Sequence, residues 1–128
     1  MQNKKIFIVD DDSFLLDMYA LKFSQSGFDV TTALGALPAL EKLRGGFIPD
    51  IILLDIVMPV VDGFEFLEKM RTENLAPNAI HIVLSNRGQE ADIQRAKELG
   101  AAGYIVKAFT TPAEVITQVG DIIAKLKK

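Results

Sequence analysis

Short apolar runs alternate along the chain with longer stretches in which apolar residues recur every three or four positions. The first pattern is typical of strands and the second of helices. We predict five strands, over residues 6–9, 28–32, 51–54, 80–84 and 104–106. The run 51–54 (IILL) is apolar at every position, as expected of a strand buried on both faces of a parallel sheet.

A helix is predicted after each strand, and most of the helix ends carry a local signal. Capping residues are expected at the starts: Asp12, Asp62, Asn86 and Thr111. Glycines follow the predicted ends at 27, 45–46 and 100. The expected inward-facing residues are Phe14, Leu15, Met18 and Leu21 in the first helix, Leu37, Leu40 and Leu43 in the second, and Val115, Ile116, Val119, Ile122, Ile123 and Leu126 in the last.

Five strand–helix units with short connections define the fold class. Right-handed crossovers between parallel strands place helices on both faces of the sheet. We therefore predict an α/β fold with three layers, a doubly wound five-stranded parallel sheet. The 128 residues of the chain suit a single domain, 1–128.

Composition narrows the function classes. Hydrophobic residues make up 49% and charged residues 24%, as in folded globular proteins, and a net charge of −3 argues against direct nucleic-acid binding. The absence of cysteine excludes disulfides, thiolate metal sites and thiol nucleophiles. No segment matches a signal peptide or a membrane span, so we expect a cytoplasmic protein without membrane contact.

Polar side chains stand where four of the predicted strands end. Asp10-Asp11, Asp55, Ser85 and Lys107 each close an apolar run. The carboxyl ends of parallel strands share one edge, where ligands bind. Carboxylate oxygens suit Mg²⁺, and an aspartate beside such an ion is a candidate phosphoryl acceptor.

Neighbouring residues of a strand point to opposite faces, so Asp10 and Asp11 are expected to play different roles, one touching the ion and the other acting through water. Taken singly, each polar residue also suits a structural role as a cap, a strand-end hydroxyl or a solvated lysine. The coincidence at four strand ends favours a site. His81, the only histidine, is expected to be structural or exposed.

The segments IFIVDDD, PDIILLDIVMPVVDG, IVLS and GYIVKAF, with the intervals between them, resemble the receiver domain of two-component response regulators over almost the whole chain. The resemblance implies a flavodoxin-like (βα)5 sheet in the order 2-1-3-4-5, the order found in a chemotaxis member of this family. It implies an Mg²⁺-dependent phosphoacceptor switch, which at most catalyses its own phosphorylation and dephosphorylation.

The resemblance also implies residue roles. Asp55 is the phosphoacceptor, supplied by a sensor histidine kinase or a histidine phosphotransfer protein. Asp10 and Asp11 form the acidic pair for Mg²⁺, with Asp11 the direct ligand. The implied roles of the other residues are a metal-binding backbone carbonyl at Val57, a switch hydroxyl at Ser85, a switch aromatic at Tyr104 and a phosphate-binding amine at Lys107.

Three departures from the family pattern are visible. Ala108 follows Lys107 where proline is usual, and we expect the bond between them to be cis. Asn86 stands where a small residue is usual and is expected to narrow access to Asp55. The segment 101–103 and the arginine-free last helix lack charges that a DNA-binding subfamily uses to dimerise.

Two other function classes stay open. A pseudo-receiver would keep the fold as a phosphorylation-independent interaction module. An aspartyl phosphatase or phosphotransferase would need a second acid two residues after Asp55, where Val57 stands. A switch of this size with no second domain is expected to signal through contacts with a downstream protein.

Overall fold

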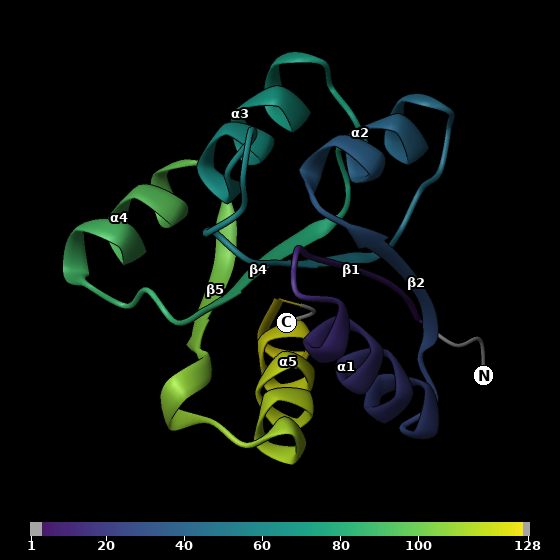
Figure 1. Ribbon diagram of the computed structural model, residues 1–128, viewed down its shortest axis with the longest axis vertical. Coiled ribbons are helices and arrows are strands. Elements are labelled where there is room, and N and C mark those ends of the chain that lie inside the picture. Colours follow the sequence, from purple (N-terminus) through teal and green to yellow (C-terminus); the bar gives the residue numbers. More distant parts are fainter. Residues whose placement is uncertain (1–3, 127–128) are drawn as a thin grey trace.

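Five parallel strands form one sheet in the order β2-β1-β3-β4-β5 in the computed structural model, which describes residues 4–126 (Figure 1). The strands are β1 (Lys5–Asp10), β2 (Asp29–Leu34), β3 (Ile51–Leu54), β4 (Ile80–Ser85) and β5 (Ala101–Val106). The predicted fold class and strand order are confirmed. The first three and last two residues of the predicted domain lie outside the described range.

Helices cover both faces of the sheet. They are α1 (Ser13–Gln25), α2 (Ala36–Arg44), α3 (Gly63–Thr72), α4 (Glu90–Glu98) and α5 (Pro112–Leu126). Helices α1 and α5 lie on one face and α2, α3 and α4 on the other, so the molecule has three layers (Figure 1). Within residues 4–126, no helix combines the length and apolar content needed to cross a membrane.

Alternation along the central strands divides the core between the two faces. Phe7 and Ile52 pack in the cluster shared with α2 and α3, whereas Ile8 and Leu53 pack in the cluster shared with α1 and α5. All four residues of β3 are buried, as its uniform apolar sequence predicts. The sheet is therefore packed against helices on both of its faces.

The predicted inward face of α1 is partly wrong. Phe14 is 76% exposed and Leu21 is 57% exposed, while the buried residues are Leu16, Tyr19 and Phe23. Apolar residues occur around most of this helix, so their spacing does not define one face; contacts with the sheet and α5 do. Leu37 and Leu126, also predicted to face inward, are exposed.

Three of the four predicted caps are confirmed. Asp12 and Asp62 accept hydrogen bonds from the N–H groups of Leu15 and Glu65. The hydroxyl of Thr111 accepts from the Glu114 N–H, and the Glu114 carboxylate accepts from the Thr111 N–H; together the two bonds form a reciprocal capping box.

Asn86 is not a helix cap. Helix α4 begins at Glu90, with Gln89 as the capping position and no side-chain cap. Residues 86–89 instead form a connecting loop at the carboxyl edge of the sheet, because the backbone does not turn helical until after Gln89. The prediction of a cap at Asn86 was wrong.

The bond between Lys107 and Ala108 is trans, since no peptide bond among the described residues is cis. The expected cis bond was wrong. A short 3₁₀ turn, η1 (Lys107–Phe109), follows β5, and its Thr110 hydroxyl donates to the Val106 carbonyl at 2.8 Å. This turn redirects the chain after Lys107 without a cis bond.

Candidate functional site

The ends of four neighbouring strands place the predicted polar residues at one edge. Val9 pairs with Leu54, so the following residues, Asp10 and Asp55, lie side by side. At the other end of this row, Ser85 pairs with Val106, and Lys107 follows directly. Parallel register alone thus brings residues from distant parts of the chain to one place.

Three carboxylates converge there. Asp10, Asp11 and Asp55 each offer an oxygen, and these oxygens all lie within 4.8 Å of one another. Asp10 and Asp55 are buried, whereas Asp11 is exposed. Like charges at such spacing repel, so the cluster needs positive charge beside it.

Lys107 supplies one such charge. Its Nζ lies 2.7 Å from an Asp10 oxygen and 3.1 Å from an Asp55 oxygen, and all three side chains are nearly inaccessible to solvent. Burial acts to lower the pKa of Lys107, but its hydrogen bond with Asp10 and the charge of Asp55 outweigh burial and raise it. The lysine therefore stays charged at neutral pH.

Burial makes the charged form of Asp10 unfavourable. Burial raises the pKa of Asp10, and its bonds with Lys107 and with the Asp12 N–H only partly oppose that effect. Both Asp10 oxygens are engaged, Oδ1 by the Asp12 N–H at 3.0 Å and Oδ2 by Lys107. The exposed neighbour, Asp11, is thus the more accessible carboxylate for a cation that arrives from solvent.

Each carboxylate oxygen of Asp55 has a hydrogen-bond partner that orients the side chain. Oδ1 accepts from the Val57 N–H at 3.1 Å, and Oδ2 faces Lys107. Beneath it, Gly63 packs so closely that an added Cβ would lie 2.5 Å from the Asp55 carbonyl oxygen. The loop after β3 therefore fixes the peptide of Asp55 as well as its side chain.

A shallow cavity of about 260 Å³ opens over these groups. It is lined by Asp10, Asp11, Asp12, Leu15, Asp55, Val57, Asn86 and Lys107. Clustered carboxylates with oxygen ligands and an open face suit a hard divalent cation such as Mg²⁺, which keeps several waters. Asn86, predicted to stand near Asp55, lies on the wall of this cavity.

Ser85 of this row and the neighbouring Tyr104 both form hydrogen bonds with the backbone of Arg87. Ser85 is fully buried, and its Oγ accepts from the Arg87 N–H at 3.2 Å. The Tyr104 hydroxyl donates to the Arg87 carbonyl. Burial raises the pKa of Tyr104, and the charge of Asp92 adds to that effect.

Sequence reasoning did not identify Arg87 or Asp92. The Arg87 guanidinium pairs with Asp92, a buried acid in the first turn of α4, at 2.8 Å. From sequence, Asp92 reads as an acid that favours a helix start. The one available signal was the position of Arg87, two residues beyond the candidate hydroxyl of Ser85.

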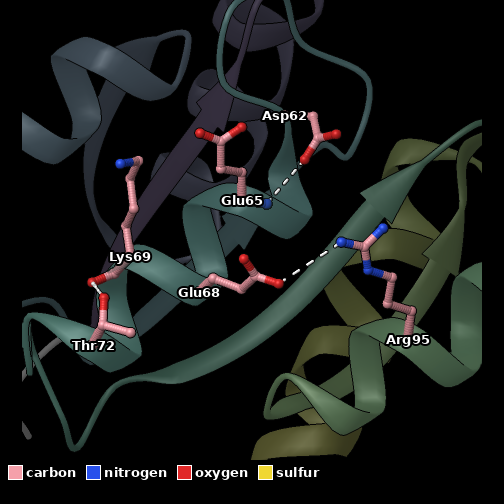
Figure 2. A pocket seen from close by; sticks show the side chains of 6 residues that line it. All are labelled: Asp62, Glu65, Glu68, Lys69, Thr72 and Arg95. Atoms are coloured by element: carbon pink, nitrogen blue, oxygen red, sulfur yellow. Dashed lines mark hydrogen bonds and ion pairs between the residues drawn. The ribbon is translucent and has the colours of Figure 1, made fainter.

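A second hollow, about 430 Å³, lies between α3 and α4 (Figure 2). Its lining residues are Asp62, Glu65, Glu68, Lys69, Thr72 and Arg95. Glu68 faces Arg95 at 3.8 Å across the hollow, and both side chains are more than half exposed. Opposite charges here compensate one another in solvent, which distinguishes this hollow from the buried acidic cluster.

The comparisons with known proteins agree with the fold. A family model described as "Response regulator receiver domain" matches residues 6–119. The chain belongs to the response regulator receiver domain family, a family of signalling domains of two-component systems.

Particular relatives are moderately similar. The chain is 31% identical to the transcriptional regulatory protein CreB of Escherichia coli K12 over 128 residues, all of this chain and 54% of CreB. It is 32% identical to the response regulator SaeR of Staphylococcus aureus USA300 over 123 residues, 96% of this chain and 52% of SaeR. The chain thus spans about half the length of these curated relatives.

Among solved structures, the chemotaxis response regulator CheY4 of Vibrio cholerae superposes with a TM-score of 0.85 at 26% identity. The match covers 94% of this chain and 99% of CheY4. The fold is therefore shared along nearly the full length of that protein.

Proposed function

We propose that this chain is a phosphoacceptor switch, phosphorylated on Asp55 in the presence of Mg²⁺. One observation carries the proposal: a buried lysine lies within 3.1 Å of Asp55, inside a cluster of three carboxylates that opens to solvent. Membership in the receiver family supports the same assignment.

The acidic cluster fits a divalent cation. Asp11, Asp10, Asp55 and the backbone carbonyl of Val57 would hold Mg²⁺, with Asp11 the direct ligand of the acidic pair. A bound Mg²⁺ supplies charge neutralisation for the transferring phosphoryl group. The accessible position of Asp11 and the full engagement of Asp10 support this division of roles.

The transfer step follows from the position of Asp55. A carboxylate oxygen of Asp55 attacks the phosphorus of a phosphohistidine; the O–P bond forms and the P–N bond breaks. The electron pair of the broken bond passes to the imidazole, which takes up a proton. Lys107 offsets the negative charge on the phosphoryl oxygens, and the Ser85 hydroxyl donates to one of them.

The switch acts by shifting a population between two arrangements. Ser85 moves toward the phosphoryl group, and Tyr104, linked to it through Arg87, responds. The phosphodonor is a sensor histidine kinase or a histidine phosphotransfer protein, and the output passes to a downstream protein. The chain itself catalyses at most its own phosphorylation and dephosphorylation.

Intact-mass measurement after incubation with acetyl phosphate tests this proposal. With Mg²⁺ we expect a mass gain of one phosphoryl group, lost in Asp55→Asn and in excess EDTA. Glu73→Gln, which alters an exposed carboxylate outside the cavity lining, is the matched control and should be phosphorylated normally. An unmodified wild-type chain would favour the phosphorylation-independent alternative.

A further inference from the structure

Arg87 stands between the two proposed switch residues and engages both of them. Its N–H donates to Ser85 Oγ at 3.2 Å, and its carbonyl accepts from the Tyr104 hydroxyl. Ser85 ends β4 and Tyr104 lies within β5, so one loop residue joins side chains of two neighbouring strands. Any displacement of the Arg87 backbone therefore moves both contacts.

The side chain of Arg87 is anchored separately. Its guanidinium meets Asp92 through two nitrogens, Nη2 at 2.8 Å and Nε at 3.4 Å. Asp92 is buried at the start of α4, and its charge also suits the helix N-terminus. The loop 86–89 carries no side-chain cap for α4, so this ion pair ties the loop to the helix.

The ring of Phe64 adds a second support. The Arg87 guanidinium carbon lies 5.9 Å from the ring centroid, and that of Arg95 lies 4.5 Å from it. Phe64 follows Gly63, which packs against the Asp55 peptide. The anchored loop thus rests on the same segment that fixes the acceptor aspartate.

We infer that the Arg87–Asp92 ion pair is a positioning element that holds the loop after β4 so that the Arg87 backbone couples Ser85 to Tyr104. Arg87 and Asp92 act through these two residues. The pair keeps the Tyr104 hydroxyl on the loop before any phosphoryl group is present. The consequence for phosphorylation rests on the proposed function, whereas the coupling itself does not.

Fluorine NMR tests the coupling directly. The chain has two tyrosines and no tryptophan, so protein labelled with 3-fluorotyrosine gives two resonances, which Tyr104→Phe assigns. In Asp92→Asn we expect the Tyr104 resonance to move toward its position in the unfolded protein, with the Tyr19 resonance unchanged. An unchanged Tyr104 resonance in folded Asp92→Asn would overturn the inference.

Two matched controls separate this effect from general destabilisation. Glu73→Gln breaks another two-bond arginine–carboxylate pair, with Arg44, and should leave Tyr104 unchanged. Arg95→Met removes the other guanidinium over Phe64, one that faces Glu68 across the hollow, and should also leave Tyr104 unchanged (Figure 2). Equal shifts in all three variants would contradict a specific role for the pair.

A double-mutant comparison measures the coupling. Ser85→Ala should shift the Tyr104 resonance in the wild-type background, because both side chains bond to the backbone of Arg87. In the Asp92→Asn background the same substitution should produce a smaller shift. Identical shifts in the two backgrounds would contradict the inference.

Binding of beryllofluoride, which mimics the phosphoryl group, in the presence of Mg²⁺ tests whether the Arg87–Asp92 pair affects the switch. We expect Asp92→Asn to bind it about two- to fivefold more weakly, the range for a partly exposed ion pair, and Arg87→Lys to lie between that variant and wild type. Equal affinities would contradict the link to the switch. Failure of the wild type to bind would count against the proposed function, while the fluorine measurements would still decide the coupling.

Discussion

The ammonium of Lys107 lies 2.7 Å from a carboxylate oxygen of Asp10, a residue 97 positions away in the sequence. Lys107 follows β5 and Asp10 ends β1, and Asp55, which follows β3, lies between them. The contact closes a charge cluster that no single strand contains.

Replacing Lys107 should leave two buried carboxylates without their counter-charge. We expect Lys107→Met to lower the free energy of unfolding without Mg²⁺ by about 3 kcal/mol, as for a buried pair that loses one partner. The same change should strengthen Mg²⁺ binding, because the ammonium no longer competes for the Asp10 and Asp55 oxygens. Urea unfolding and Mg²⁺ titration measure the two effects.

Lys42→Met, at an exposed position of α2, is the control for Lys107→Met. It should change neither quantity. An equal loss of stability in both variants would show that the buried cluster has no special electrostatic role.

Asp10→Asn should stabilise the Mg²⁺-free protein at pH 7. The pKa of Asp10 is raised by burial, so the folded state binds its proton more tightly than the unfolded state does. That contribution to stability is present below the ordinary value of 3.8 and is lost as the pH rises through the folded pKa. The uncharged amide therefore removes a cost that the ionised wild type bears.

With Mg²⁺ bound, we expect the wild type to be more stable than Asp10→Asn, the reverse of their order without Mg²⁺. At a concentration 100 times its dissociation constant, a ligand that binds only the folded state stabilises it by about 2.7 kcal/mol. We expect thermal unfolding to show this gain for wild type and a much smaller one for Asp10→Asn. Equal gains would exclude Asp10 from the metal site.

Gly63→Ala should destabilise the protein through the acceptor loop. The added Cβ would lie 2.5 Å from the Asp55 carbonyl oxygen and 2.7 Å from the Ile56 Cα, and backbone atoms do not yield as side chains do. We expect a loss of about 1–3 kcal/mol in urea unfolding, together with slower phosphorylation by acetyl phosphate.

Gly120→Ala is the matched control for Gly63→Ala. Gly120 is an exposed residue of α5 with open space around its Cβ direction, so alanine should stabilise the helix by about 0.5–1 kcal/mol. Similar effects at the two glycines would contradict the close packing beneath Asp55.

His81 should make the free energy of unfolding decrease as the pH falls. It is the only histidine in the sequence, and burial lowers its pKa below 6.5. Its Nε2 is buried and has no hydrogen-bond partner among residues 4–126. The unfolded state thus binds the proton more readily. This contribution is present above pH 6.5 and is lost as the pH falls toward the folded pKa, by at most about 1.4 kcal/mol per pH unit.

His81→Leu should flatten the decline between pH 7 and 5.5, as measured by urea unfolding at each pH. It should also gain about 1 kcal/mol at pH 7, because an unpaired buried nitrogen is removed. Asp10 titrates in both proteins and cancels from the comparison. Parallel pH profiles would show that His81 does not cause the decline.

Sequence patterns predicted the sheet well, because the apolar pattern of each strand agrees with the burial that the fold imposes on it. Residues 51–54 are apolar throughout and form the central strand β3 over that same range. Polar residues after such strands must lie at one edge once the strands are parallel. The convergence of Asp10, Asp55 and Lys107 therefore follows from topology, although their proposed roles remain predictions.

Features set by long-range packing were less predictable. Helix α1 has apolar residues on most sides, and only its contacts with the sheet and α5 bury Phe23 and expose Phe14. The spacing after Asn86 resembles a cap, yet helix α4 begins only at Glu90, after an extended Gln89. The Arg87–Asp92 pair depends on that loop conformation, which no local pattern specifies.

The proposed function requires that one particular carboxylate, that of Asp55, accepts the phosphoryl group. The most direct measurement is borohydride trapping after incubation with acetyl phosphate and Mg²⁺, followed by peptide mapping. Borohydride reduces an acyl phosphate to an alcohol, so we expect homoserine at position 55 alone. Homoserine at Asp10 or Asp11, or at no position in a folded Mg²⁺-treated sample, would contradict it.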